Sequence, residues 1–140
     1  MINEKEELWY QRTFDVPSAW RGKQILLHFG AVDWKAEVWV NDVKVGEHTG
    51  GFTPFYFDIT SVLNKGNNDL VVKVWDPSDR GEQPRGKQIA NPHGIWYTPV
   101  TGIWQTVWLE PVATQYITNL KTTPDIDNNS VKVEVAANTT

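Results

Sequence analysis

The chain has 140 residues, the size of one ordinary domain and too short for a (β/α)₈ barrel, which needs roughly 200 to 250 residues. Hydrophobic residues make up 40% of it and charged residues 21%, as in globular proteins, whereas eight tryptophans exceed what core packing usually uses. Thirteen basic and seventeen acidic residues give a net charge of -4. Because no dense Lys/Arg cluster accompanies them, we expect no nucleic-acid partner.

The sequence contains no cysteine, which excludes a disulfide scaffold, a thiolate metal centre and a thiol nucleophile. Its longest apolar runs are far shorter than the roughly 18 residues of a membrane span, so we expect no membrane partner. The acidic start, residues 1–7, does not resemble a signal peptide. The compartment is left open between the cytoplasm, the periplasm and the exterior of a bacterium.

Apolar and polar residues alternate with a period of two along most of the chain, which is typical of half-buried strands. Asn41-Asp42 predicts a tight hairpin turn between two such segments, and a single helical turn is expected at residues 60–64. The pattern predicts an all-β fold, an antiparallel two-sheet sandwich. The predicted strands are residues 8–16, 24–29, 36–40, 43–47, 55–59, 70–75 and 103–110.

The alternation lapses over residues 76–102, a loop rich in proline and glycine, and so long a loop in a compact domain is usually functional. Residues 115–122 and 130–136 then predict two more strands with no strands after them. We therefore expect one sandwich over residues 1–112 and the start of a second domain over residues 113–140. Because a lone hairpin is marginally stable in water, these two strands should dock on the sandwich or on a neighbouring copy, the latter giving a homodimer.

Aromatic rings stack on the apolar faces of sugars, while carboxylates, amides and guanidinium groups bind the hydroxyls. Aromatic and polar side chains in the predicted loops are therefore candidate carbohydrate contacts. The alternative is that the aromatic residues cap the ends of the sandwich and that the charges are solvated. The candidates are Asp33, Trp34, His48, Arg85, Gln88, Trp96 and Tyr97.

Four tryptophans lie instead on predicted strands, where we expect them to pack in the core or against a sheet: Trp39, Trp75, Trp104 and Trp108.

Neither a metal centre nor catalytic machinery is predicted. The three histidines lie too far apart in sequence for a local metal pair, and no cofactor is expected. Asp76 and Asp79 are the candidates for a calcium ion held partly by backbone carbonyls. Residues 125–136 lack the glycine and the glutamate of a calcium loop, so a simple turn is expected there. No two carboxylates stand out as a glycosidase pair, and no G-x-S-x-G motif is present, so no catalytic residue is assigned.

Several motifs of the chain occur together in one known family. They are residues 29–34, 38–41, 45–55 and 57–60 and the run Thr101-Gly-Ile-Trp-Gln-Thr-Val-Trp-Leu-Glu110. Together they resemble the N-terminal sugar-binding-type domain of glycoside hydrolase family 2. Arg85-Gly-Lys-Gln88 and Trp96-Tyr-Thr-Pro99 are most similar to the β-galactosidase-type branch. The resemblance implies a jelly-roll sandwich similar to galactose-binding folds. It also implies a following immunoglobulin-like domain, whose start residues 115–140 resemble, and a TIM barrel that carries the catalytic glutamates. One β-galactosidase pattern has an aspartate that binds sodium at the position of Thr106, so the resemblance does not imply sodium binding through this residue.

Three hypotheses follow. The first is a non-catalytic accessory module of a family 2 glycoside hydrolase that supports the barrel and shapes the cleft for its carbohydrate substrate, with the downstream domains as partners. The second is a module that binds glycans autonomously. The third is a structural or adhesive sandwich, favoured if the loop aromatics are buried.

Overall fold

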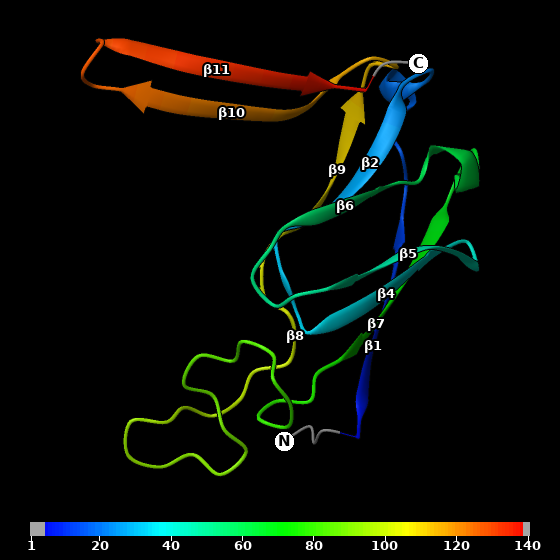
Figure 1. The fold of residues 1–140 in the computed structure, drawn as a ribbon. Helices are drawn as coiled ribbons and strands as arrows, with labels where there is room; N and C mark the ends of the chain where they lie inside the picture. The colour runs from blue at the N-terminus through cyan, green and yellow to red at the C-terminus, as the bar shows by residue number, and fades with distance from the viewer. Residues whose placement is uncertain (1–4, 139–140) are drawn as a thin grey trace.

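The computed structural model describes residues 5–138, and strands make up nearly all of the regular structure (Figure 1). Two single-turn 3₁₀ helices, η1 (Ser18–Trp20) and η2 (Thr60–Val62), complete it. Across this described part no helix is long and apolar enough to cross a membrane. The strands are β1 (Glu7–Phe14), β2 (Gln24–Phe29), β3 (Val32–Asp33), β4 (Lys35–Val40), β5 (Val43–Thr49), β6 (Phe55–Asp58), β7 (Asn68–Trp75), β8 (Gly102–Ile103), β9 (Val107–Val112), β10 (Ile117–Asp125) and β11 (Ser130–Ala137).

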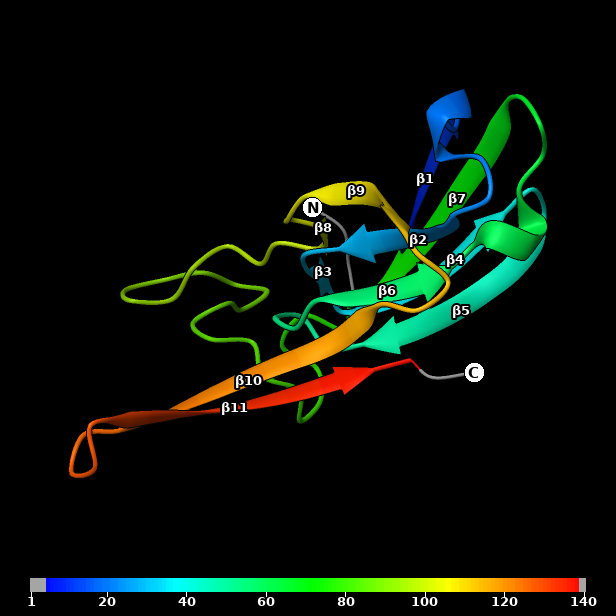
Figure 2. The same ribbon diagram turned by 90° about the horizontal axis from the view of Figure 1, so that it is seen from above.

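Two antiparallel sheets pack face to face, one in the order β1-β7-β4-β5 and the other in the order β6-β2-β9 (Figure 2). The predicted all-β antiparallel sandwich is thus confirmed. Asn41 and Asp42 join β4 to β5 with φ angles of 50° and 65°, the left-handed conformation that a two-residue hairpin turn needs. The sequence did not predict β3, or the break that divides the predicted strand at residues 103–110 into β8 and β9; β3 and β8 pair with each other over only two residues.

The core lies between the sheets and is filled from alternate strand positions. Leu27 and Phe29 point inward from β2, and Val38 and Val72 meet them from the other sheet; all four are almost completely buried. Burying such a side chain stabilises a fold by roughly 1.5 to 3 kcal/mol. This core supplies the rigid platform at whose end the long loop sits.

The expectation of a core position is wrong for the four strand tryptophans, none of which is fully buried. Trp39 alternates with Val38 and Val40, which take the inward positions, so its ring lies on the outer face and stacks on Trp9 at 5.9 Å. Packing against a sheet is therefore confirmed for Trp39. Trp108 lies on the outer face of the other sheet, and Trp104 lies between β8 and β9 rather than on a strand.

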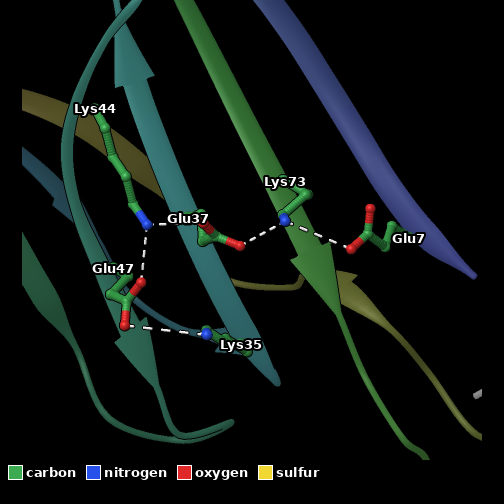
Figure 3. Close-up of polar contacts among 6 residues, drawn as sticks. All are labelled: Glu7, Lys35, Glu37, Lys44, Glu47 and Lys73. Atoms are coloured by element: carbon green, nitrogen blue, oxygen red, sulfur yellow. Dashed lines mark hydrogen bonds and ion pairs between the residues drawn. The ribbon is translucent and has the colours of Figure 1, made fainter. Parts of the chain in front are cut away.

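A ladder of alternating charges crosses the outer face of the four-stranded sheet (Figure 3). Lys73 on β7 lies 2.6 Å from Glu37 on β4 and 3.5 Å from Glu7 on β1. Lys44 on β5 lies 2.7 Å from Glu37 and 2.9 Å from Glu47. Hydrogen bonds from Lys44 and then Lys73 lower the pKa of Glu37 to about 2. The charges on this face satisfy one another across the strands.

β10 and β11 form a hairpin whose residues are all exposed and which extends away from the sandwich (Figures 1 and 2). The prediction that it docks on the sandwich of its own chain is wrong. The side chain of Asn138 ties the base of the hairpin to the incoming connection, because its Nδ2 donates to Thr114 O at 2.9 Å and its Oδ1 accepts from Tyr116 N at 2.6 Å. This clamp closes the base of the hairpin. Docking on a second copy stays a prediction.

Candidate functional site

The long connection between β7 and β8 extends from one end of the sandwich (Figure 1). It doubles back on itself, because Tyr97 N donates to Lys87 O at 2.7 Å and Ile89 N donates to Tyr97 O at 3.1 Å. Two distant stretches of the loop are thereby held side by side. The loop therefore has a defined shape although it contains no regular strand.

Buried Asp76 anchors both ends of this loop. Its Oδ1 accepts from Ser78 N and its Oδ2 accepts from Thr101 Oγ1, both at 2.7 Å. Asp79 holds the middle of the loop, with its Oδ2 accepting from Ala90 N at 3.0 Å. The two calcium candidates thus serve hydrogen bonds of the loop itself. Among residues 5–138, no three side chains of the metal-binding types gather in one place.

Asp33, at the end of β3, lies on the floor of a hollow of about 470 Å³ between the loop and the turn after β5. We call this space the loop-end hollow. Its floor and walls include Arg85 and Gln88, and the peptide bond between Asp33 and Trp34 is cis. A Cβ atom on Gly51 would lie 2.6 Å from Asp33 Oδ1, so glycine is needed for the turn to approach the carboxyl group.

The carboxyl group of Asp33 is electrostatically unusual. Only 8% of the residue is exposed. This burial, together with the nearby charge of Asp76, raises its pKa to about 6, although a hydrogen bond from Gln88 opposes the change. Such shifts are concentrated at functional sites, because burying a carboxyl group beside a second one costs stability that packing alone would not require.

Three exposed aromatic residues form the rim of the loop-end hollow: Phe52, Tyr97 and Trp104, which are 56%, 62% and 46% exposed. Trp104 is held in place because its Nε1 donates to Gly51 O at 2.8 Å, and Phe52 meets its ring edge-on at 6.1 Å. Apolar ring faces thus surround a carboxyl, a guanidinium and an amide group. This combination suits a sugar, whose faces stack and whose hydroxyls need polar partners.

Of the seven predicted contact residues, the structure brings four together in the loop-end hollow: Asp33, Arg85, Gln88 and Tyr97.

The other three do not line the loop-end hollow. His48 stacks on Phe55 at 4.1 Å with its Nε2 3.1 Å from Thr53 Oγ1, and burial lowers its pKa. The backbone amide of Trp96 donates to His93 O within the loop, and the ring is 37% exposed. Trp34 is half-buried beside the cis peptide bond.

Sequence reasoning missed Phe52 and Trp104. Phe52 follows Gly50-Gly51, a pair that signals a turn, so its position in a loop could be predicted from the sequence. Trp104 follows the end of the long loop, but the period-two pattern assigned it to a strand. Its exposure depends on the break between β8 and β9, which the sequence does not mark.

Comparison with known proteins gives a consistent result. The family model described as glycosyl hydrolases family 2, sugar binding domain, matches residues 1–110. A β-galactosidase of Thermoanaerobacter pseudethanolicus is 35% identical over 134 residues, which cover 94% of this chain and 17% of that protein. A putative β-glucuronidase of Formosa agariphila is 32% identical over 126 residues, which cover 89% of this chain and 14% of that protein. The chain thus spans less than a fifth of the length of either relative.

Solved structures agree with the family match. A β-glucuronidase of an uncultured Clostridium species superposes with a TM-score of 0.72 at 27% identity, covering 95% of this chain and 24% of that one. A β-glucuronidase of Ruminococcus gnavus gives a TM-score of 0.76 at 25% identity, covering 96% and 24% of the two chains. From its all-β sandwich and the family match over most of its length, we conclude that this chain belongs to glycosyl hydrolase family 2 and contains the sugar binding domain of that family.

Proposed function

We propose that this chain acts as a non-catalytic accessory domain of a family 2 glycoside hydrolase, with the loop-end hollow contributing to the wall of the substrate cleft. The hollow supports this role because it gathers Asp33, Arg85 and Gln88 beneath an exposed aromatic rim. These groups come from β3 and from a loop more than fifty residues later, and it is the tertiary fold that brings them together at one end of the sandwich. The parent enzyme's substrate would be a glycoside.

The carboxyl groups at the hollow favour binding over hydrolysis. A glycosidase places two carboxyl groups on either side of the scissile bond, roughly 5 to 10 Å apart, and both must reach the sugar. Asp33 lines the loop-end hollow, whereas both oxygens of its neighbour Asp76 are engaged by Ser78 and Thr101. We therefore assign the catalytic carboxylates to the barrel of the longer parent enzyme.

An activity assay tests this assignment. The purified chain should release no chromophore from nitrophenyl galactosides, glucuronides or mannosides. An Asp33→Asn variant prepared in the same way is the control for contaminating glycosidases. Turnover that copurifies with the chain and disappears in the variant would show that the domain is itself an enzyme.

The exposed aromatic rim also favours the second candidate function, autonomous glycan binding. Calorimetric titration with galactose and with glucuronate separates the two roles, because an accessory domain alone should give no saturable heat. Autonomous binding should instead be lost in a Trp104→Ala variant. Trp108→Ala is the matched control, since Trp108 is exposed to a similar degree, 42%, but stacks on His28 on the outer face of a sheet.

We further propose that residues 113–140 begin an immunoglobulin-like second domain. The strand register places Leu120, Val133 and Val135 on one face of the β10–β11 hairpin, and Lys121 and Glu134 on the other. The apolar face is more than half exposed, so in the parent enzyme the remaining strands of that domain would cover it.

In the isolated chain this apolar face should pair with a second copy. Sedimentation velocity should show a dimer that Val133→Lys dissociates. Asn119→Lys, on the charged face opposite Ala136, should not dissociate it. A chain that stays monomeric at all concentrations contradicts the dimer, while leaving the second domain to be tested in the parent enzyme.

A further inference from the structure

A second hollow opens at one flank of the sandwich and shares no lining residue with the loop-end hollow. It has a volume of about 500 Å³, and we call it the flank hollow. Phe14 and Val72 line it from the four-stranded sheet, and Phe29, Val107 and Leu109 line it from the three-stranded sheet. Phe29 and Val72 are core residues with 0% and 1% exposure, so the flank hollow reaches the core.

The two sheets contain different numbers of strands, which explains why this flank is open. At the opposite flank β5 and β6 close the sandwich, with the backbone of Gly46 lying directly against the Phe57 ring. At the open flank the edge strands are β1 and β9, which Figure 2 shows on the same side of the molecule. The four-stranded sheet faces a sheet of three strands, and the space that a fourth strand of the smaller sheet would fill lies beside β9.

The outer edge of β9 has backbone groups directed toward that space. Gly30 N donates to Thr106 O at 2.9 Å, which makes Phe29 and Val107 a non-hydrogen-bonded pair of the β2–β9 ladder. The N–H and C=O groups of Val107 and Leu109 therefore point away from β2. Pro111, at the next such position, lacks an N–H group, so its place on an edge strand costs no ladder hydrogen bond.

We propose that this edge of β9 takes an additional strand: an extended segment with apolar side chains at alternate positions, supplied by the parent enzyme from outside residues 1–140. Its backbone would pair with Val107 and Leu109, and its inward side chains would fill the flank hollow. The source of the segment rests on the proposed function, and the known relatives have the necessary chain, being several times longer than this one. A strand beside β1 instead would extend the larger sheet and leave the flank hollow open.

The test uses the 140-residue chain and a synthetic octapeptide in which isoleucine alternates with lysine and glutamate, a sequence that does not occur in this chain and that stands in for the unidentified segment. In the ¹⁵N-labelled chain, the amides of Val107 and Leu109 should exchange with solvent faster than that of Trp108, which pairs with His28. At saturating peptide their exchange should slow about tenfold or more. The methyl signals of Val72 and Leu109 should shift with them.

Two variants at one position separate pairing from packing. Val107→Pro removes an N–H group that β2 does not use, and it should abolish the peptide-dependent protection of the Leu109 amide from exchange. Val107→Thr, which keeps the N–H group and the side-chain shape, should retain it. Leu109→Pro serves as a second edge-blocking variant if Val107→Pro does not fold, as judged by its thermal melting.

No protection of Val107 and Leu109 at millimolar peptide overturns the proposal. Shifts confined to the β10–β11 hairpin also overturn it, because they show pairing with the hairpin instead. Neither result involves sugar binding or hydrolysis, so the proposed accessory role would survive both.

Discussion

Replacing Asp33 by asparagine should stabilise the protein at neutral and alkaline pH. The folded-state pKa of Asp33 rises from 3.8 to about 6, mainly through burial. An acid with a raised pKa holds its proton more tightly when folded, so ionising it above pH 6 costs folding free energy. This cost is absent below pH 3.8, where the group is protonated in both the folded and the unfolded states.

The size of the effect follows from the same values. A change from 3.8 to about 6 corresponds to at most about 3 kcal/mol, and partial solvation reduces it to roughly 1 to 2 kcal/mol. Asparagine keeps the shape of the side chain without its charge. Asp33→Asn should therefore gain roughly 1 to 2 kcal/mol over the unsubstituted chain at pH 8, and the gain should shrink toward zero at pH 4.

Urea denaturation followed by tryptophan fluorescence between pH 4 and pH 8 measures this difference. Asp76→Asn is a comparison rather than an independent control, because the charge of Asp76 helps to raise the pKa of Asp33 and its carboxyl group also accepts hydrogen bonds from Ser78 and Thr101. Its amide cannot accept both in the same way, so this variant should lose roughly 1 to 3 kcal/mol. An Asp33→Asn variant that is less stable at pH 8, or whose difference does not vary with pH, refutes the reasoning.

Three further perturbations test the rest of the structure by the same denaturation assay. Asn68→Ala removes a fully buried side chain that makes three hydrogen bonds, one of them from Asn41, and should cost about 3 kcal/mol; a loss below about 1 kcal/mol contradicts this. Glu37→Gln should cost about 1 kcal/mol at pH 7, because the pKa of Glu37 is lowered. That difference should disappear as the pH falls from 4.5 toward 2, and its persistence at pH 2 would exclude the ion pairs as the cause. Deleting residues 113–140 should lower the denaturation midpoint of the sandwich only slightly, because β10 and β11 are exposed throughout and Tyr116, at the base of the hairpin, contributes a hydrogen bond to Tyr56; a large drop would show docking.

The strands and their turn were predictable because their signals are local. Alternation with a period of two marks each half-buried strand, and Val38 and Val40 take the inward positions that this pattern assigns to them. Asn41-Asp42 marks the hairpin turn, since few residues adopt positive φ readily. Sequence motifs in several of these strands were also enough to indicate the family.

The site and the edges of the sandwich depended on contacts between residues far apart in the chain. The sequence placed Asp33 and Arg85 in separate loops, but the hydrogen bonds of Asp76 and Asp79 that fold the long loop bring them to one hollow. The raised pKa of Asp33 has the same origin, because burial is a property of the assembled fold. The outward course of the hairpin is likewise a property of the tertiary structure that strand propensity does not determine. Periodicity specifies which side of a strand faces inward, whereas the way loops and edges meet is decided by long-range hydrogen bonds and packing that leave no periodic signal in the sequence.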